Sequence, residues 1–200
     1  MKFLCLPELS LYLNKIIEIK KEMRKLQNEE LDRLTIGEFK KIQKIPLVLI
    51  LDNIRSMHNI GSVFRTSDAF LIESVYLCGL AASPPQKDIH KTALGSTESV
   101  EWKYFEDTVA AIESLKKENY VIIGIEQTNK SIMLQDFLPK ENEKYALVFG
   151  HEVRGVEQRV IDLCDFSIEV PQYGTKHSLN ISVCAGIVVW ELFRKIKFHK

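Results

Sequence analysis

The stretch VPQYGTKHSLNISV, residues 170–183, decides the fold. An apolar strand is predicted to end near Val170, and an apolar run from Ile181 to Phe193 is predicted to form a buried helix. The loop between them carries Lys, His, Ser and Asn side chains to the start of that helix, where backbone N–H groups need partners. An α/β protein builds a binding pocket at such a junction of strand, polar loop and helix.

Two earlier stretches have the same organisation. The run PLVLILD, residues 46–52, reads as a buried strand and is followed by NIRSMHNIGSVFR, residues 53–65. The run YALVF, residues 145–149, is a second apolar strand and is followed by GHEVRG, residues 150–155. Short apolar runs that end in polar, glycine-containing turns are typical of a parallel sheet. Because ligands bind at the carboxyl ends of such strands, the three loops predict one composite site.

These stretches, in order, resemble the motifs of the SpoU/TrmH family of S-adenosylmethionine-dependent RNA 2′-O-ribose methyltransferases, within the SPOUT superfamily. The resemblance covers about residues 46–194. The residues that match the three motifs are Asn59, Gly61 and Arg65, then Gly150, Glu152 and Gly155, then Pro171, Gly174, Ser178, Leu179, Asn180 and Ser182.

Between the motifs, strands and helices are expected to alternate. Strands are predicted over residues 74–78, 100–105, 120–125 and 166–170, and helices over residues 59–70, 107–118, 156–163 and 181–193. Residues 80–89 are expected to form a loop and residues 90–99 a polar segment interrupted by glycine. This alternation predicts an α/β fold with a largely parallel sheet and helices on both faces. The family resemblance alone implies a deep C-terminal trefoil knot.

The chain is expected to divide into an N-terminal basic helical extension, residues 1–45, and a SPOUT methyltransferase domain, residues 46–200. Apolar residues at helical spacing predict a helix over residues 8–30, and a second short helix is expected over residues 32–44 with Thr35 as its N-cap. This arm could bind RNA, or it could cover an edge of the core or a second copy of the chain.

The formal net charge is zero, but the charges are unevenly distributed. Residues 1–45 carry 10 Lys and Arg against 7 Asp and Glu, residues 46–190 carry 13 against 19, and residues 191–200 carry 4 against 1. Phosphate binding needs local positive charge, so the basic ends are candidates for contact with RNA. A solvated helix face explains the lysines equally well.

The four cysteines include no C-x-x-C pair and no histidine at metal-ligand spacing, so reduced thiols in a cytoplasmic protein and no metal site are predicted. No signal peptide is expected, because Pro7 and Glu8 interrupt the apolar N-terminus. The apolar run of residues 181–193 is shorter than a membrane span and contains Glu191, so no membrane partner is expected.

The glycine spacing of residues 150–155 is similar to that of a phosphate-binding P-loop. Val156 and Glu157 follow, where a nucleoside triphosphate hydrolase would have Lys and Ser or Thr. A cofactor held by backbone groups and flanked by apolar side chains remains possible. The resemblance implies that this cofactor is S-adenosyl-L-methionine, and the residues expected to bind it are Ile125, Gly150, Val170 and Leu179.

Five polar residues are the candidates for catalysis by resemblance: Asn59, Arg65, Glu152, Ser178 and Asn180. In the family the first-motif arginine, here Arg65, activates the ribose hydroxyl. Guanidinium stays protonated in proteins, so two roles are open: a base assisted by the substrate phosphate, or a cation that orients that phosphate and the hydroxyl. A surface salt bridge from Arg65 to Asp68 or Asp52 is the alternative without function.

The other candidates are expected to support Arg65. Glu152 would align Arg65 or the ribose, and Ser178 and Asn180 would fix the loop and the substrate. Asn59 would cap its helix or orient a ligand. Ser178 or Asn180 could instead be only the N-cap of the last helix. His90 and Lys91 lie in a glycine-containing segment that could bind a flipped nucleoside.

The sequence is therefore identified as an RNA 2′-O-methyltransferase that acts on a ribose hydroxyl, with a tRNA D-loop guanosine as the favoured target. The short chain, without room for a separate N-terminal RNA-binding domain, favours tRNA over rRNA. One alternative is an rRNA methyltransferase, and the other is a catalytically idle RNA-binding or assembly protein. A homodimer is expected, formed by the helix of residues 181–193 and the helix after Asn59, because residues 181–193 are apolar on more than one face.

Overall fold

The computed structural model describes residues 23–198, which divide between Leu34 and Thr35 into two parts. Residues 23–34 contain one short 3-10 helix, η1 (Asn28–Glu30). The prediction of a helix over residues 8–30 is wrong for residues 23–27, and residues 8–22 lie outside the described range. The Gln27 N–H donates to the Glu30 carboxylate at 2.8 Å, so it is not available for the helical bond to Met23.

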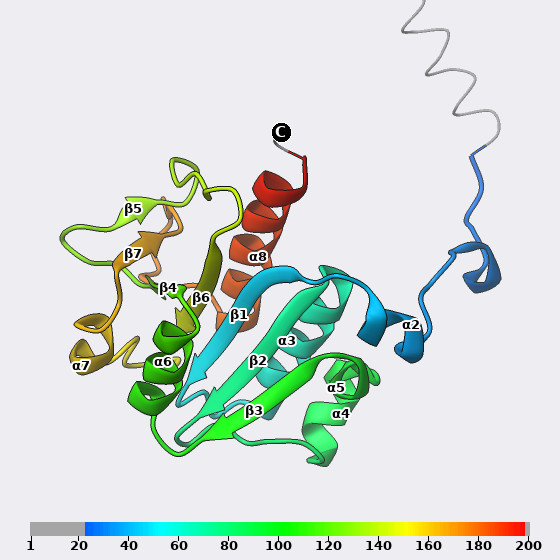
Figure 1. The fold of residues 1–200 in the computed structure, drawn as a ribbon, viewed down its shortest axis with the longest axis horizontal. Helices are drawn as coiled ribbons and strands as arrows, with labels where there is room; N and C mark the ends of the chain where they lie inside the picture. The colour runs from blue at the N-terminus through cyan, green and yellow to red at the C-terminus, as the bar shows by residue number, and fades with distance from the viewer. Residues whose placement is uncertain (1–22, 199–200) are drawn as a thin grey trace, which may run out of the picture. The chain divides into compact units, whose positions relative to one another are not determined.

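The larger part, residues 35–198, is built on a seven-stranded sheet in the order β3-β2-β1-β6-β4-β7-β5 (Figure 1). Every strand pair is parallel, as predicted. The strands are β1 (Ile45–Asp52), β2 (Ile72–Cys78), β3 (Glu101–Phe105), β4 (Tyr120–Ile125), β5 (Ile132–Met133), β6 (Lys144–Phe149) and β7 (Phe166–Glu169).

Helices cover both faces of the sheet, which confirms that prediction. The helices are α2 (Ile36–Lys41), α3 (Met57–Ala69), α4 (Lys87–Ala93), α5 (Ser96–Ser99), α6 (Thr108–Lys117), α7 (Gln158–Ile161) and α8 (Ile181–Phe198). Leu49 and Leu51 of β1 belong to one apolar core with α3 and α8. Val48 and Ile50 belong to a second core with α6 and α7. Because both faces of β1 are covered, its sequence is apolar throughout rather than alternating.

N-cap hydrogen bonds from side chains mark the starts of α2 and α6. The Thr35 hydroxyl accepts the Glu38 N–H at 3.2 Å, and the Glu38 carboxylate bonds back to the Thr35 N–H at 2.8 Å, so Thr35 caps α2 in a capping box. Asp107 caps α6 through the Val109 N–H. The helix predicted over residues 32–44 is therefore formed only by the six residues of α2.

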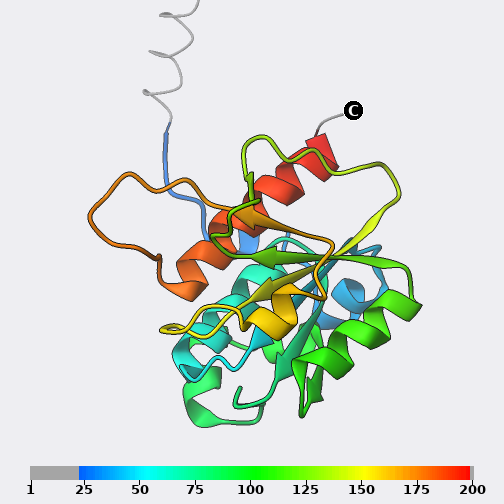
Figure 2. The same ribbon diagram turned by 90° about the vertical axis from the view of Figure 1, so that its left-hand side faces the viewer.

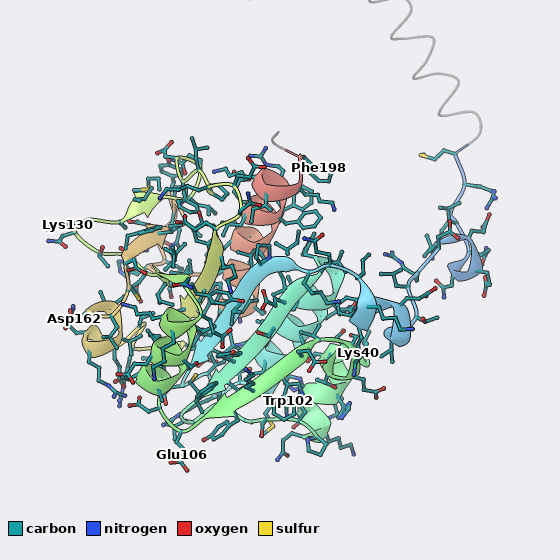
Figure 3. The ribbon with its side chains drawn as sticks, viewed as in Figure 1. Lys40, Trp102, Glu106, Lys130, Asp162 and Phe198 are labelled. Atoms are coloured by element: carbon teal, nitrogen blue, oxygen red, sulfur yellow. The ribbon has the colours of Figure 1, made fainter. Side chains whose placement is uncertain are left out.

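Three segments differ from the prediction. Residues 80–89 are predicted to form a loop and residues 90–99 a polar segment interrupted by glycine, but residues 80–99 contain α4 and α5, with Leu94 in the left-handed region between them. Only the four residues of α7 form the helix expected over residues 156–163, because the Glu157 backbone is extended, with φ −61° and ψ 143°, and the helix begins after it. The last helix continues to Phe198, which Figure 3 shows at the C-terminal end of α8.

The loop of residues 170–180, orange in Figure 2, runs out from β7 and returns to the start of α8. No helix within residues 23–198 is both long enough and apolar enough to cross a membrane.

Candidate functional site

The loops that follow β4, β6 and β7 enclose a cavity of about 570 Å³ at the carboxyl edge of the sheet. All four residues predicted to bind the cofactor line this cavity, namely Ile125, Gly150, Val170 and Leu179. Glu152 and Ser178 line it as well. The cavity lies where ligands bind in parallel α/β sheets. The loops after β6 and β7 line it as predicted, whereas no residue of the first-motif loop, residues 53–65, does.

Gly150 is needed because two backbone segments approach closely at the cavity wall. A Cβ atom at Gly150 would lie 2.2 Å from both the carbonyl carbon of Gly155 and the amide nitrogen of Val156. The approach is held by His151 and Gly155, whose backbones exchange hydrogen bonds of 3.1 and 2.8 Å. Gly155 itself has a φ of +67°, which favours glycine.

Two residues after β4 join the loops of the cavity. Glu126 accepts the Val156 N–H at 2.9 Å and so holds the loop after β6. Gln127 donates from its side chain to the His177 carbonyl at 3.1 Å and so holds the loop after β7. Sequence reasoning missed this pair, although its position directly after a buried strand was a usable signal.

The carboxylate of Glu152 connects the second motif to the first. Its Oε1 accepts the Ser56 N–H at 3.2 Å and the Asn59 side-chain amide at 3.3 Å. Its Oε2 accepts the Arg55 N–H at 3.5 Å. Ser56 is the N-cap of α3, so Glu152 places a negative charge at the start of that helix, where the helix dipole favours it. Glu152 therefore contacts Asn59 rather than Arg65.

Burial opposes the ionisation of Glu152. Hydrogen bonds from its own backbone and from Ser56, Asn59 and Arg55 outweigh that effect and lower the pKa of Glu152 below its ordinary value. The carboxylate is accordingly ionised at neutral pH and acts as an acceptor.

Asn180 joins the third motif to this network and also caps α8. Its side-chain amide donates to Asn59 Oδ1 at 3.2 Å. Its Oδ1 accepts the Ser182 N–H at 2.9 Å and the Val183 N–H at 3.4 Å, which is the geometry of an N-cap. Asn180 thus is the N-cap of α8, one of the two roles that the sequence left open, and all three motifs meet at Asn59.

Arg65 is the predicted site residue that the structure does not bring into this group. It is exposed on α3 and lines a second hollow, between α3 and α4, instead of the cavity. The alternative salt bridges are wrong: Asp68 accepts a hydrogen bond from Ser99, and the buried Asp52 is bonded to Thr108 at 2.5 Å and Asn53 at 2.9 Å. Six helical residues separate Asn59 from Arg65, which places them on different faces of α3.

Among the residues that the structure describes, no group of three or more His, Cys, Asp or Glu side chains could hold a metal ion. His151 Nδ1 accepts the Val153 N–H at 3.0 Å. Cys78, Cys164 and Cys184 are free, and burial raises the pKa of the Cys78 thiol to about 12.

A parallel α/β sheet with a cavity at its carboxyl edge is the arrangement in which α/β proteins of the nucleotide-binding class hold their ligands. The particular family follows from comparison with known proteins. Residues 46–190 match the SpoU rRNA Methylase family, and the chain belongs to it.

Curated relatives and solved structures agree with this assignment. The chain is 30% identical over 161 residues to a putative TrmH family tRNA/rRNA methyltransferase of Staphylococcus saprophyticus, covering 80% of this chain and 63% of the relative. It is 32% identical over 163 residues to a protein of the same description from Staphylococcus aureus strain MSSA476, covering 79% of this chain and 64% of the relative. The chain thus spans just under two thirds of the length of these curated relatives.

The crystal structure of the A. aeolicus TrmH/SpoU tRNA modifying enzyme is similar, with a TM-score of 0.69, 27% identity and 78% of each chain covered. The SpoU methyltransferase AviRb from Streptomyces viridochromogenes, solved with the cofactor AdoMet, has a TM-score of 0.70 at 22% identity, with 86% of this chain and 66% of that chain covered. The second likeness shows that the two proteins share a fold.

Proposed function

We propose that this protein transfers a methyl group from S-adenosyl-L-methionine to a ribose 2′-hydroxyl of RNA. The observation that carries the proposal is the meeting of three separate motif loops, through Glu152, Asn59 and Asn180, beside one cavity. Membership of the SpoU rRNA Methylase family supports RNA methylation. With RNA as its substrate, the protein is expected to act in the cytoplasm.

The cavity suits this cofactor. Gly150 lets the backbone of Gly155 and Val156 approach closely at the cavity wall, since a Cβ atom there would clash with these backbone atoms. The side chains of Ile125, Val170 and Leu179 supply apolar surface for an adenine ring. When bound, S-adenosyl-L-methionine supplies the electrophilic methyl group of the reaction.

The protein's own residues would then orient the acceptor. Ionised Glu152 fixes Asn59, and Asn180 fixes the same amide from the other side, so a ribose bound next to them meets a rigid polar surface. Arg65 is proposed to act at the hydroxyl, either as a base assisted by the substrate phosphate or as a cation that orients hydroxyl and phosphate. Ser178, at the cavity wall, is proposed to contact the substrate.

A homodimer would complete the site, since Arg65 lies outside the lining of the cofactor cavity. On α8, Val183, Ile187 and Trp190 are 52%, 40% and 47% exposed and form one stripe at helical spacing. A second copy that covers this stripe could bring its own Arg65 to the cavity. Sedimentation should show a dimer for the unmodified protein, and a stable monomer at micromolar concentration would count against this arrangement.

The favoured target is a tRNA D-loop guanosine, supported by the likeness to the tRNA modifying enzyme at 27% identity. An rRNA target is the alternative, because the curated relatives are described for both tRNA and rRNA. A catalytically idle RNA-binding protein is the third possible function, and the presence of all five motif residues argues against it.

We also propose the C-terminal knot, since the connection from β4 to β5 spans β7, which lies between those two strands.

The function is tested with Arg65→Ala. This variant should lose methyl transfer from labelled cofactor to bulk tRNA and keep its affinity for S-adenosyl-L-methionine in calorimetry, because Arg65 lies away from the cavity. Turnover close to that of the unmodified protein would refute the role of Arg65. If the unmodified protein transferred no methyl group to either tRNA or rRNA, the result would favour a catalytically idle RNA-binding protein.

A further inference from the structure

The second hollow, of about 490 Å³, lies between α3 and α4 and is not part of the cofactor cavity. Arg65 and Thr66 of α3 line one side, and Lys91 and Thr92 of α4 line the other. None of the described residues that line it is acidic. It therefore places two cationic side chains around one concave surface.

Close packing of α4 against α3 creates this arrangement. A Cβ atom at Gly61 would lie 2.1 Å from Thr92 Oγ1 and 2.4 Å from the Ile89 carbonyl oxygen, so only glycine permits the approach. Thr92 strengthens the contact by donating to the His58 carbonyl at 3.0 Å. The motif residue Gly61 thus brings Lys91 to the same surface as Arg65.

The two cations have donors available. The Arg65 side chain has no hydrogen-bond or ion-pair partner among the residues of the described range 23–198, and its guanidinium carries five N–H donors. Lys91 Nζ donates to Asp88 at 2.7 Å, which uses one of its three protons. Residues 46–190 carry 13 basic against 19 acidic residues, so most of this domain repels phosphate and a local pair of cations is distinctive.

We propose that this hollow is a subsite for an RNA phosphodiester, held between the Arg65 guanidinium and the Lys91 ammonium group. The proposal rests on the proposed function. If Arg65 acts at a ribose 2′-hydroxyl, the 3′-phosphate of the same nucleotide is attached to the neighbouring ribose carbon and must lie close to Arg65. Lys91 supplies the second charge, and a single phosphate oxygen pair can accept from both groups.

The test measures binding of bulk tRNA to the full chain as a function of salt, with no cofactor present. Lys91→Gln should weaken binding roughly tenfold, as expected for one charge-assisted contact. It should also reduce the slope of log affinity against log salt by about 0.7 to 0.9. Lys91→Arg keeps the charge and should retain most of the affinity. Lys140→Gln is the matched control, because Lys140 also forms an exposed i,i+3 ion pair, with Glu143 at 3.6 Å, away from the hollow.

A double-mutant cycle tests whether the two cations hold the same phosphate. Arg65→Gln and Lys91→Gln together should cost clearly less than the sum of the single changes, because either one already removes most of the subsite. An unchanged salt slope in Lys91→Gln, an equal loss in Lys140→Gln, or strict additivity in the cycle would each overturn the proposal.

These outcomes separate the subsite from the function. If the unmodified protein methylates RNA and Lys91→Gln binds tRNA normally, only the subsite fails. If the protein binds tRNA through Lys91 and Arg65 but transfers no methyl group, only the proposed function fails. If the unmodified protein does not bind RNA, both are wrong.

Discussion

Replacing Gly150 by Ala should strongly reduce cofactor binding. The new Cβ atom would lie 2.2 Å from two backbone atoms of the loop after β6, whereas ordinary contacts begin at 3.4 Å. The loop must therefore move by about 1.2 Å, the difference between these distances. No side-chain rotation can relieve the clash, because both contacted atoms, in Gly155 and Val156, belong to the backbone.

This displacement would break the two backbone hydrogen bonds between His151 and Gly155, of 3.1 and 2.8 Å. Each such bond contributes about 0.5–1.5 kcal/mol, so the loss of both, about 1–3 kcal/mol, corresponds to a decrease in affinity of roughly 5- to 150-fold. Calorimetry with S-adenosyl-L-methionine measures the effect directly.

Gly174→Ala is the matched control in the neighbouring loop, where a Cβ atom would meet nothing within 4 Å. Its affinity should stay close to that of the unmodified protein. If Gly150→Ala also bound the cofactor with nearly unchanged affinity, the cavity wall at Gly150 would not be part of the cofactor site.

Two further predictions concern stability. Lys195 is buried and donates to the carbonyls of Leu134, Gln135 and Phe137 at 2.7–2.9 Å. Lys195→Met should therefore lower the free energy of unfolding, measured by urea titration, by about 3–5 kcal/mol. Lys197 is exposed, so the control Lys197→Met should change this free energy little. The pKa of Glu152 is lowered from its ordinary value of 4.5, so Glu152 stabilises the fold above that pH and loses this contribution as the pH falls through the lowered pKa. Glu152→Gln should therefore melt at a lower temperature than the unmodified protein at neutral pH, and a difference that did not shrink in acid would contradict this account.

The sequence predicted those parts of the fold that depend on local chemistry. The central strands β1, β4 and β6 are apolar runs between polar turns, and their bounds agree with prediction to within a residue. The cap at Thr35 could be predicted for the same reason, because a helix cap is a contact between residues two or three positions apart.

Contacts between residues that are far apart in the sequence could not be predicted in this way. The sequence does not show that the Glu157 backbone is extended, so the helix after β6 was predicted too long. It also does not show that α4 packs on Gly61, so residues 80–89 were predicted as a loop although α4 begins at Lys87, and no helix was predicted over residues 90–99. The sheet order and the two-residue strand β5 depend on pairing partners far along the chain in the same way.

For the candidate site as well, the positions of the motifs along the chain could be predicted, but the contacts between them could not. Each motif could be located by its residues. Only the structure shows that the Asn59 side chain is hydrogen-bonded to both Glu152 and Asn180. The position of Arg65 on another face of α3 depends on the helical rotation between residues 59 and 65, which the motif spacing contains. That spacing could have indicated at the outset that Asn59 and Arg65 of one chain do not lie on the same face of α3.

The central claim is methyl transfer to a ribose oxygen, and the most direct test is to locate the transferred group. The full chain is incubated with bulk tRNA and S-adenosyl-L-methionine that carries an isotopically labelled methyl group, and the digested nucleosides are analysed by mass spectrometry. The account predicts the label on the ribose of a 2′-O-methylated nucleoside, with guanosine favoured, and its loss in Arg65→Ala. Label found on a base, or no label in any RNA offered, would contradict it.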